Sequence, residues 1–252
     1  MAEGILSAIK KPQHVTIAEK VATRAKELGE KYKVKVARDL KDVVRRADLI
    51  FLAVRPQDVE SVAQEVTGEF SKEQTLVSIV AGKTLSSLRK AFGKNVNLIR
   101  VMPNLALRSG AGMCAVCAEK RTPRAALDEV LAILGSAGRC VELKEKAFDV
   151  VTALSGSGLA YFAYMCKAMA EGGVSLGLKK DVADLLARQT MFGTAKFLVE
   201  SGFELEPFIE GVATKGGTTA AGMVELDKNK TFKDIVAKTL SAAAKRSSEL
   251  AG

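Results

Sequence analysis

The sequence contains a single histidine, His14, and only four cysteines. Catalytic triads that use a histidine base and metal sites with several histidines therefore have too few of the residues they need. Four cysteines in a chain of 252 residues also do not make a disulfide framework. We therefore expect neither a histidine-based triad nor a metal site.

Two of the cysteines, Cys114 and Cys117, form a C-x-x-C pattern. They lie in the alternating stretch 112–118, which predicts a β-strand. Residues three apart on a strand face opposite sides of the sheet, so these two thiols could not share a metal ion. We interpret them as core residues.

No apolar run approaches the length needed to span a membrane, and residues 1–4 lack the basic-then-apolar order of a signal peptide. The sequence therefore predicts a soluble, cytoplasmic protein. The net charge of +9 raises the question of nucleic acid binding. However, basic residues are mixed with acidic ones, as in 27–41, so we interpret them as a solvated surface that mildly favours anionic ligands.

The first 143 residues alternate between short apolar segments and helical patterns. Strands are predicted at 14–18, 33–37, 49–54, 75–80, 97–101, 112–118 and 140–143, and helices at 2–9, 20–32, 39–47, 59–66, 85–91 and 123–134. This alternation predicts an α/β domain over residues 1–143, with a doubly wound, Rossmann-like parallel sheet. Ligands of such sheets bind at the carboxyl ends of the strands.

From residue 144 onward the pattern is helical alone. Helices are predicted at 145–154, 159–172, 180–201, 206–212, 218–226 and 231–250. We therefore expect a second, all-helical domain over residues 144–252. Its alanines and glycines permit close helix packing, either within the domain or against a second subunit.

The stretch 213–219, Ala-Thr-Lys-Gly-Gly-Thr-Thr, runs directly into a predicted helix. Its glycines allow a ligand to approach the backbone, and the first N–H groups of the helix lack partners within it. The stretch is therefore a candidate cradle for a small carboxylate. The alternative is a glycine-rich cap between two helices.

The sequence contains no G-x-G-x-x-G, and nothing before Ala2 supplies a first strand. In the common strand order of a nucleotide-binding sheet that strand is central, so its absence leaves its two neighbours without backbone partners. We expect that the chain is N-terminally incomplete and lacks the first strand. The alternative is a different αβ arrangement that never had that strand.

Several stretches resemble the motifs of the pyrroline-5-carboxylate reductase family, in order and spacing over essentially the whole chain. Met1–Leu6 is similar to the end of the family's opening motif, Gly-Ala-Gly-Asn-Met-Ala followed by a helix. The other stretches are Leu52–Gln57, Ser78–Gly82, Arg100–Asn104, Thr152–Gly158 with Ala160 and Tyr161, and Gly216–Thr219 with Ala221 and Gly222. The resemblance implies an NAD(P)H-dependent oxidoreductase that reduces 1-pyrroline-5-carboxylate to proline, the last step of proline synthesis. It also implies a homodimer or a larger assembly of dimers.

The sequence departs from the family pattern at three places. Leu105 and Ala106 replace the usual Thr-Pro, which removes a polar contact near the nicotinamide. Leu159 stands where a proline usually opens a helix, which loses a preset φ. Lys215 replaces a proline before Gly-Gly and places a positive charge beside the expected carboxylate.

The resemblance also implies which residues contact the cofactor. The segments expected to line it from adenine to nicotinamide are Ala53, Val54, Arg55 and Pro56, and Val80, Ala81 and Gly82, with Asn104 near the nicotinamide. Glu19 would accept a hydrogen bond from the ribose 2′-hydroxyl of NADH, whereas Lys20 would bind the 2′-phosphate of NADPH. We favour NADPH because the family often uses it.

For the substrate, the resemblance implies a cyclic imine that carries a carboxylate. The N–H groups of Gly216, Gly217 and Thr218, with the Thr214 hydroxyl, are expected to bind the carboxylate, and the Thr218 or Thr219 hydroxyl to meet the ring nitrogen. Thr218 is the candidate catalytic residue, and catalysis would rest mainly on positioning. The stretch 155–158 either borders the same pocket or forms a tight helix-to-helix corner.

Two other functions stay open on the sequence. A hydroxyacid-type NAD(P)-dependent dehydrogenase shares this domain order and needs a lysine base, for which Lys167 or Lys196 is available. A non-catalytic dimerising remnant, without its cofactor loop, is the second.

Overall fold

The computed structural model describes residues 1–7, 9 and 11–251. Its compact units are Met1–Ser157 with Ala243–Gly252, and Gly158–Ala242. The sequence-based boundary between residues 143 and 144 stays a prediction. Residue 8, inside the predicted helix 2–9, lies outside the described residues, and the helix α1 spans Ala2–Leu6.

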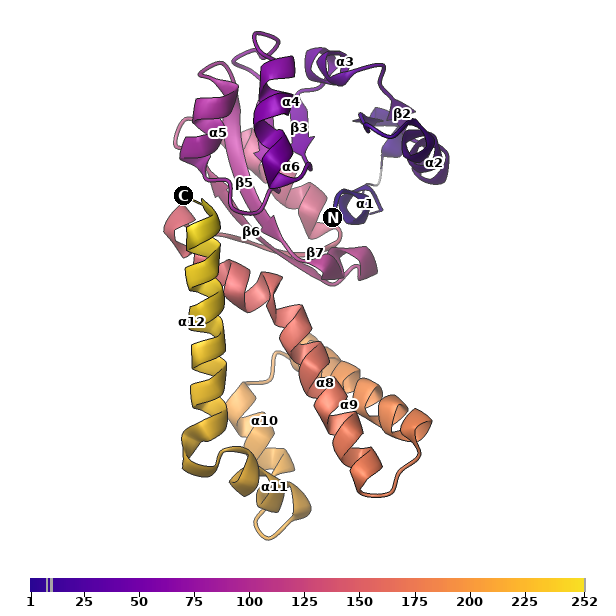
Figure 1. Cartoon of the computed structure of the whole chain (residues 1–252), viewed down its shortest axis with the longest axis vertical. Coiled ribbons are helices and arrows are strands. Elements are labelled where there is room, and N and C mark those ends of the chain that lie inside the picture. Colours follow the sequence, from indigo (N-terminus) through magenta and orange to yellow (C-terminus); the bar gives the residue numbers. More distant parts are fainter. Residues whose placement is uncertain (8, 10, 252) are drawn as a thin grey trace. The chain divides into compact units, whose positions relative to one another are not determined.

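The first unit contains a five-stranded sheet, shown in Figure 1, with strand order β3-β4-β5-β6-β7. Its strands are β3 (Leu49–Leu52), β4 (Thr75–Ser78), β5 (Asn97–Pro103), β6 (Gly112–Ala118) and β7 (Gly138–Glu142). The pairs β3–β4, β4–β5 and β6–β7 are parallel. A mostly parallel, Rossmann-like sheet is therefore confirmed.

One pair departs from the predicted all-parallel sheet, because β5 and β6 are antiparallel. The residues between them contain only a short 3-10 helix, η3 (Leu105–Ser109). A parallel pair needs a crossover of about a dozen residues or more, whereas an antiparallel pair needs only a short connection. The length of this connection therefore decides the direction of β6.

Two further strands, β1 (Thr16–Ile17) and β2 (Lys35–Val36), form a separate parallel pair. They are joined by α2 (Ala22–Tyr32). Within the described residues neither strand pairs with β3, so the sheet that the alternation predicts is divided in two. The division falls where the common strand order places its first strand.

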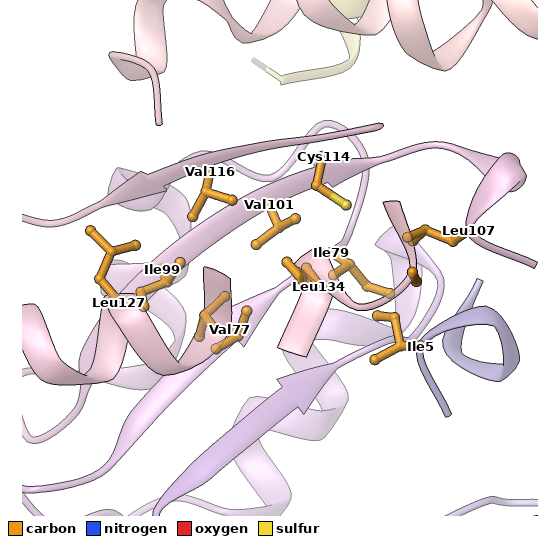
Figure 2. Close-up of a cluster of buried hydrophobic side chains, with 12 residues drawn as sticks. Ile5, Val77, Ile79, Ile99, Val101, Leu107, Cys114, Val116, Leu127 and Leu134 are labelled. Atoms are coloured by element: carbon orange, nitrogen blue, oxygen red, sulfur yellow. The ribbon is translucent and has the colours of Figure 1, made fainter. Parts of the chain in front are cut away.

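Helices cover both faces of the five-stranded sheet. On one face, shown in Figure 2, Val77, Ile99 and Val101 pack with Leu127 and Leu134. The helices on this face are α1 and α6 (Arg124–Gly135), and those on the other are α3 (Leu40–Arg46), α4 (Val59–Glu65) and α5 (Leu85–Phe92). Because successive strand residues face opposite sides, β4 and β5 supply apolar side chains to both layers.

Strand β6 confirms the prediction for its cysteines. Cys114 belongs to the cluster under α1 and α6, whereas Cys117 packs with Phe148 on the opposite face. Phe148 opens α7 (Phe148–Val151), which follows the short 3-10 helix η4 (Glu145–Ala147). Both thiols are core side chains, less than a tenth exposed.

The second unit is helical, as predicted. Its helices are α8 (Gly158–Ser175), α9 (Lys180–Ser201), α10 (Leu205–Val212), α11 (Thr218–Leu226) and most of α12 (Thr231–Ala251), with η6 (Lys228–Lys230) before α12. α8 and α9 pack through small residues, Cys166 and Ala170 against Ala183 and Ala187. Within the described part of the chain, no helix is both long and apolar enough to cross a membrane.

Large apolar side chains of this unit remain exposed. Leu176 is 89% exposed and Phe162 is 69% exposed, and neither α10 nor α11 buries a residue. An apolar surface of this extent on a helical unit is typical of a subunit interface.

Candidate functional site

Three of the predicted cofactor segments follow adjacent parallel strands. Ala53–Pro56 follows β3 and leads into η2 (Pro56–Asp58), Val80–Gly82 follows β4, and Asn104 follows β5. The carboxyl ends of parallel neighbours lie at one edge of a sheet, so the structure brings these segments together. Ala53, Arg55 and Ala81 are exposed there, whereas Val80 is buried.

Gly82 occupies a position that other residues would strain. Its φ is +76°, in the left-handed region, and a Cβ built on it would lie 2.9 Å from the backbone oxygen of Leu250. Leu250 belongs to the part of α12 that packs with the first unit. The end of α12 therefore lies against the predicted cofactor loop, a contact that sequence patterns did not indicate.

The Asn104 side chain is buried and held at both ends. Its Oδ1 accepts from the Met113 N–H at 3.1 Å, and its Nδ2 donates to the Ser155 Oγ at 3.3 Å and to the Ser155 carbonyl at 3.4 Å. The Asn104 N–H donates to the Met113 carbonyl at 3.1 Å. These bonds fix Asn104 at the end of β5.

Ser155 lies in a π-helical segment, η5 (Thr152–Gly156). Ser157, after it, keeps helical angles of φ −84° and ψ −26° before α8 begins. η5 and α8 therefore meet within 155–158, and both interpretations of this stretch, a border of the substrate pocket and a tight helix-to-helix corner, stay predictions. π-Helical turns are frequent at functional sites, because the extra residue re-aims neighbouring groups.

On β5, four residues before Asn104, a buried ion pair was not predicted from the sequence. Arg100, 6% exposed, donates to Glu145 Oε1 at 2.9 Å, and its guanidinium lies 4.7 Å from the Phe148 ring centre. The same carboxylate oxygen accepts from the Leu85 N–H at 2.7 Å. The Arg100–Glu145 pair, with the Leu85 N–H, links the start of α5 and the 145–148 segment to strand β5.

After β1, Glu19, the residue predicted to contact the ribose, already has partners within the chain. Glu19 accepts from the Val21 N–H at 3.1 Å and lies 3.6 Å from the Arg24 guanidinium. Lys20 is exposed beside it. Lys20 and Arg24 are both cations, and the Glu19 carboxylate beside them already has partners. These groups suit an anionic phosphate better than a ribose hydroxyl.

In the second unit, the glycine-rich stretch forms a turn before α11. The Gly217 N–H donates to the Thr214 carbonyl at 2.9 Å, and Gly216 has φ +78°. A Cβ on Gly217 would lie 2.9 Å from Thr214 Oγ1. The Gly217 amide is therefore used inside the turn, and the first N–H groups of α11, from Thr218 and Thr219, are those without an acceptor in their own helix.

The two lysines considered as bases are surface residues of the second unit. Lys167 lies 3.6 Å from Glu171, and Lys196 lies 3.8 Å from Glu200, each one helical turn along. Their side chains are 65% and 55% exposed. Exposed pairs of this kind are ordinary helix-surface contacts and give no support to a catalytic base.

Comparison with known proteins gives two matching family descriptions. Residues 145–250 match "Pyrroline-5-carboxylate reductase dimerisation", and residues 1–82 match "NADP oxidoreductase coenzyme F420-dependent". A pyrroline-5-carboxylate reductase of Synechocystis is 35% identical, over 99% of this chain and 94% of the relative. That of Arabidopsis thaliana is 33% identical, over 99% of this chain and 90% of the relative.

The chain belongs to the pyrroline-5-carboxylate reductase family. The resemblance read from its motifs is thereby confirmed, and solved structures agree with it. The chain covers 95% of a pyrroline-5-carboxylate reductase from Coxiella burnetii with a TM-score of 0.95 and 26% identity. It covers 93% of a Plasmodium falciparum pyrroline carboxylate reductase with NADP bound, with a TM-score of 0.85 and 26% identity.

The pyrroline-5-carboxylate reductase fold accounts for the order of the two units. A nucleotide-binding sheet comes first and a dimerisation domain second, as the two family matches divide the chain. The predicted site residues then fall into two groups, one at the sheet edge of the first unit and one at the start of α11 in the second.

Proposed function

We propose that the protein is an NADPH-dependent reductase of 1-pyrroline-5-carboxylate, which forms proline. The observation that carries the proposal is the similarity of sequence to reductases of this name over 99% of the chain. The site geometry supports it. Asn104 is fixed at the end of a central strand, and a glycine turn opens the helix that carries Thr218.

The cofactor would lie at the carboxyl edge of the first unit's sheet. Lys20 and Arg24 would hold the 2′-phosphate, which favours NADPH over NADH, because Glu19 is already bonded to the Val21 amide and paired with Arg24. Ala53–Pro56 and Val80–Gly82 would line the cofactor from adenine to nicotinamide, and Asn104 would lie near the nicotinamide. Bound NADPH would supply a hydride to the C=N carbon of the imine.

The substrate carboxylate would be bound at the start of α11. The amides of Gly216, Thr218 and Thr219, with the Thr214 hydroxyl, would donate to it, and the positive end of the helix would stabilise its charge. Gly217 contributes by having no side chain, because a Cβ would meet Thr214 there. The Lys215 ammonium would add a further attractive charge.

The Thr218 or Thr219 hydroxyl would contact the ring nitrogen. A protonated imine is already electrophilic, so these residues would orient the ring and hold the nitrogen's proton rather than supply a strong acid. Most of the rate enhancement would come from positioning.

The protein would act in the cytoplasm as a homodimer or as an assembly of dimers. The match of residues 145–250 to a dimerisation family supports this assembly. So does the exposed apolar surface of α8, α9 and α10, which a second copy would cover.

Stopped-flow or steady-state oxidation of NADPH at 340 nm, with 1-pyrroline-5-carboxylate, tests the proposal on this polypeptide. We expect turnover with the imine, none with hydroxyacids, and a lower KM for NADPH than for NADH. Hydroxyacid oxidation without imine reduction would favour the dehydrogenase alternative. Absence of NAD(P)H binding in a fluorescence titration would favour the non-catalytic remnant.

A further inference from the structure

Two cysteines far apart in the sequence are direct neighbours in the sheet. Cys114 of β6 and Cys140 of β7 are register partners in a parallel pair. Both side chains lie on the face covered by α6, since Cys114 belongs to that core cluster and Cys140 packs against it. Figure 2 shows Cys114 at the edge of this cluster.

The backbone spacing of this pair suits a disulfide. Adjacent strands lie about 4.8 Å apart, and disulfides join Cα atoms that are about 4.4 to 6.8 Å apart. Both cysteines are free thiols. The register of β6 and β7 therefore places the two Cα atoms within the range that a disulfide joins.

The two thiols differ in exposure and acidity. Cys114 is 0% exposed, whereas Cys140 is only partly buried. The neighbouring Cys140 thiol and burial raise the pKa of Cys114, and the Cys114 thiol lowers the pKa of Cys140. Cys140 is therefore the thiol that solvent reaches and that ionises first.

We propose that Cys114 and Cys140 form a reversible disulfide when the protein meets a peroxide. The Cys140 thiolate attacks one peroxide oxygen, the O–O bond breaks, and the released oxygen leaves as water after taking up a proton. The Cys114 sulfur then attacks the sulfenic acid on Cys140, the S–O bond breaks, and hydroxide leaves as water with the Cys114 proton. Two thiols are oxidised and one hydrogen peroxide is reduced to two waters.

This modification lies close to the candidate site. The Met113 N–H donates to Asn104, and Met113 directly precedes Cys114. Cys114 is also the register partner of Pro103, the residue before Asn104.

The test treats the full chain with hydrogen peroxide and measures the modification directly. We expect the number of thiols titrated after unfolding to fall from four to two. Mass spectrometry should show a loss of about 2 Da and a Cys114–Cys140 cross-linked peptide, both reversed by dithiothreitol. Cys140→Ser should abolish the cross-link, while Cys166→Ser, at a buried thiol of α8, should leave it unchanged.

Three results would overturn the proposal. They are sulfinic acid at Cys140 with Cys114 still reduced, a disulfide that joins other cysteines or two copies of the chain, and no loss of thiols while the protein stays folded. Because these readouts need no activity, they are independent of the proposed reductase function.

Discussion

The side chain of Asn104 joins the end of strand β5 to Ser155, 51 residues further along the chain. Its Nδ2 lies 3.3 Å from the Ser155 Oγ, while its Oδ1 accepts from Met113 at 3.1 Å. A residue expected to face the nicotinamide is thus held in one orientation by two neighbouring elements. The family's Met-Pro-Asn motif and its Ser-Gly-Ser-Gly motif are parts of one hydrogen-bonded unit.

Replacing Asn104 should therefore affect both stability and cofactor binding. Asn104→Ala leaves the Met113 N–H without its side-chain partner, and we expect a loss of about 1 to 3 kcal/mol in the free energy of unfolding. We also expect the KM for NADPH to rise about fivefold or more, equivalent to roughly 1 kcal/mol. Ser155→Ala, which keeps the Met113 bond, is the control and should lose about 1 kcal/mol of stability. An unchanged KM in Asn104→Ala would show that Asn104 does not contact the cofactor.

Thr218→Ala tests the substrate site at the start of α11. Loss of a hydroxyl that bonds a charged substrate should lower kcat/KM roughly 10- to 100-fold, equivalent to about 1.4 to 2.8 kcal/mol. The Kd for NADPH, measured by fluorescence, should stay the same. Thr239→Ala is the matched control, because its hydroxyl bonds only the Ile235 carbonyl of its own helix. Normal kinetics in Thr218→Ala would remove this residue from the mechanism.

Glu3 should make stability depend on pH in the acid range. Hydrogen bonds from Lys31 and Tyr32 lower the pKa of Glu3 from 4.5 to about 2. The pKa is depressed in the folded state, so the stabilisation is complete above about pH 4.5 and is lost as the pH falls towards 2. Wild type should have a higher Tm than Glu3→Gln at pH 6, and the difference should shrink by pH 3. A difference that stays constant over this range would contradict the assignment.

Breaking the ion pair between Arg100 and Glu145 should be costly. Glu145→Ala leaves the Arg100 guanidinium buried without its carboxylate, and the expected loss is about 3 to 5 kcal/mol in urea unfolding. The control, Glu142→Ala, removes an exposed partner of Arg124 and should cost about 1 kcal/mol or less. Equal losses in the two variants would mean that burial of Arg100 does not decide the energy.

Gly82→Ala tests the contact between the β4 loop and the end of α12. A residue other than glycine at positive φ costs about 1 to 2 kcal/mol, and at Gly82 the new Cβ would also meet the Leu250 carbonyl. Gly68→Ala is the control, since Gly68 has φ +80° with no atom within 4 Å of its Cβ position. Thermal unfolding should show a larger loss for Gly82→Ala. If the two variants lose the same stability, the Leu250 contact is not tight in solution.

Much of the fold follows from local pattern. The continuous apolar run at 49–54 and the alternating stretch 112–118 correspond to strands β3 and β6, and the helical periodicity at 180–201 corresponds to α9. The alternation on β6 also placed Cys114 and Cys117 on opposite faces. Such patterns depend only on residues that are close together in the chain, so the sequence is enough to predict them.

The cofactor and substrate segments were predicted from motifs and stay predictions. The grouping of the three cofactor segments at the sheet edge follows from parallel strand order. The partners of the site residues were not found. No local pattern links Asn104 to Ser155, or Gly82 to Leu250, because each pair is separated by many residues and meets only when the chain folds. The π-helical turn at Thr152–Gly156 was missed for the same reason, since its geometry depends on what it packs against.

The sequence by itself determined the alternation of strands and helices, the change to helices after residue 143, and the reductase motifs, because these depend on side-chain type and spacing. Only the tertiary structure decided the division of the sheet between β1 and β3 and the neighbouring positions of Cys114 and Cys140. Strand pairing is made by backbone hydrogen bonds between distant segments. Every residue except proline offers the same backbone N–H and C=O groups, so the local pattern that predicts a strand does not name its partner strand.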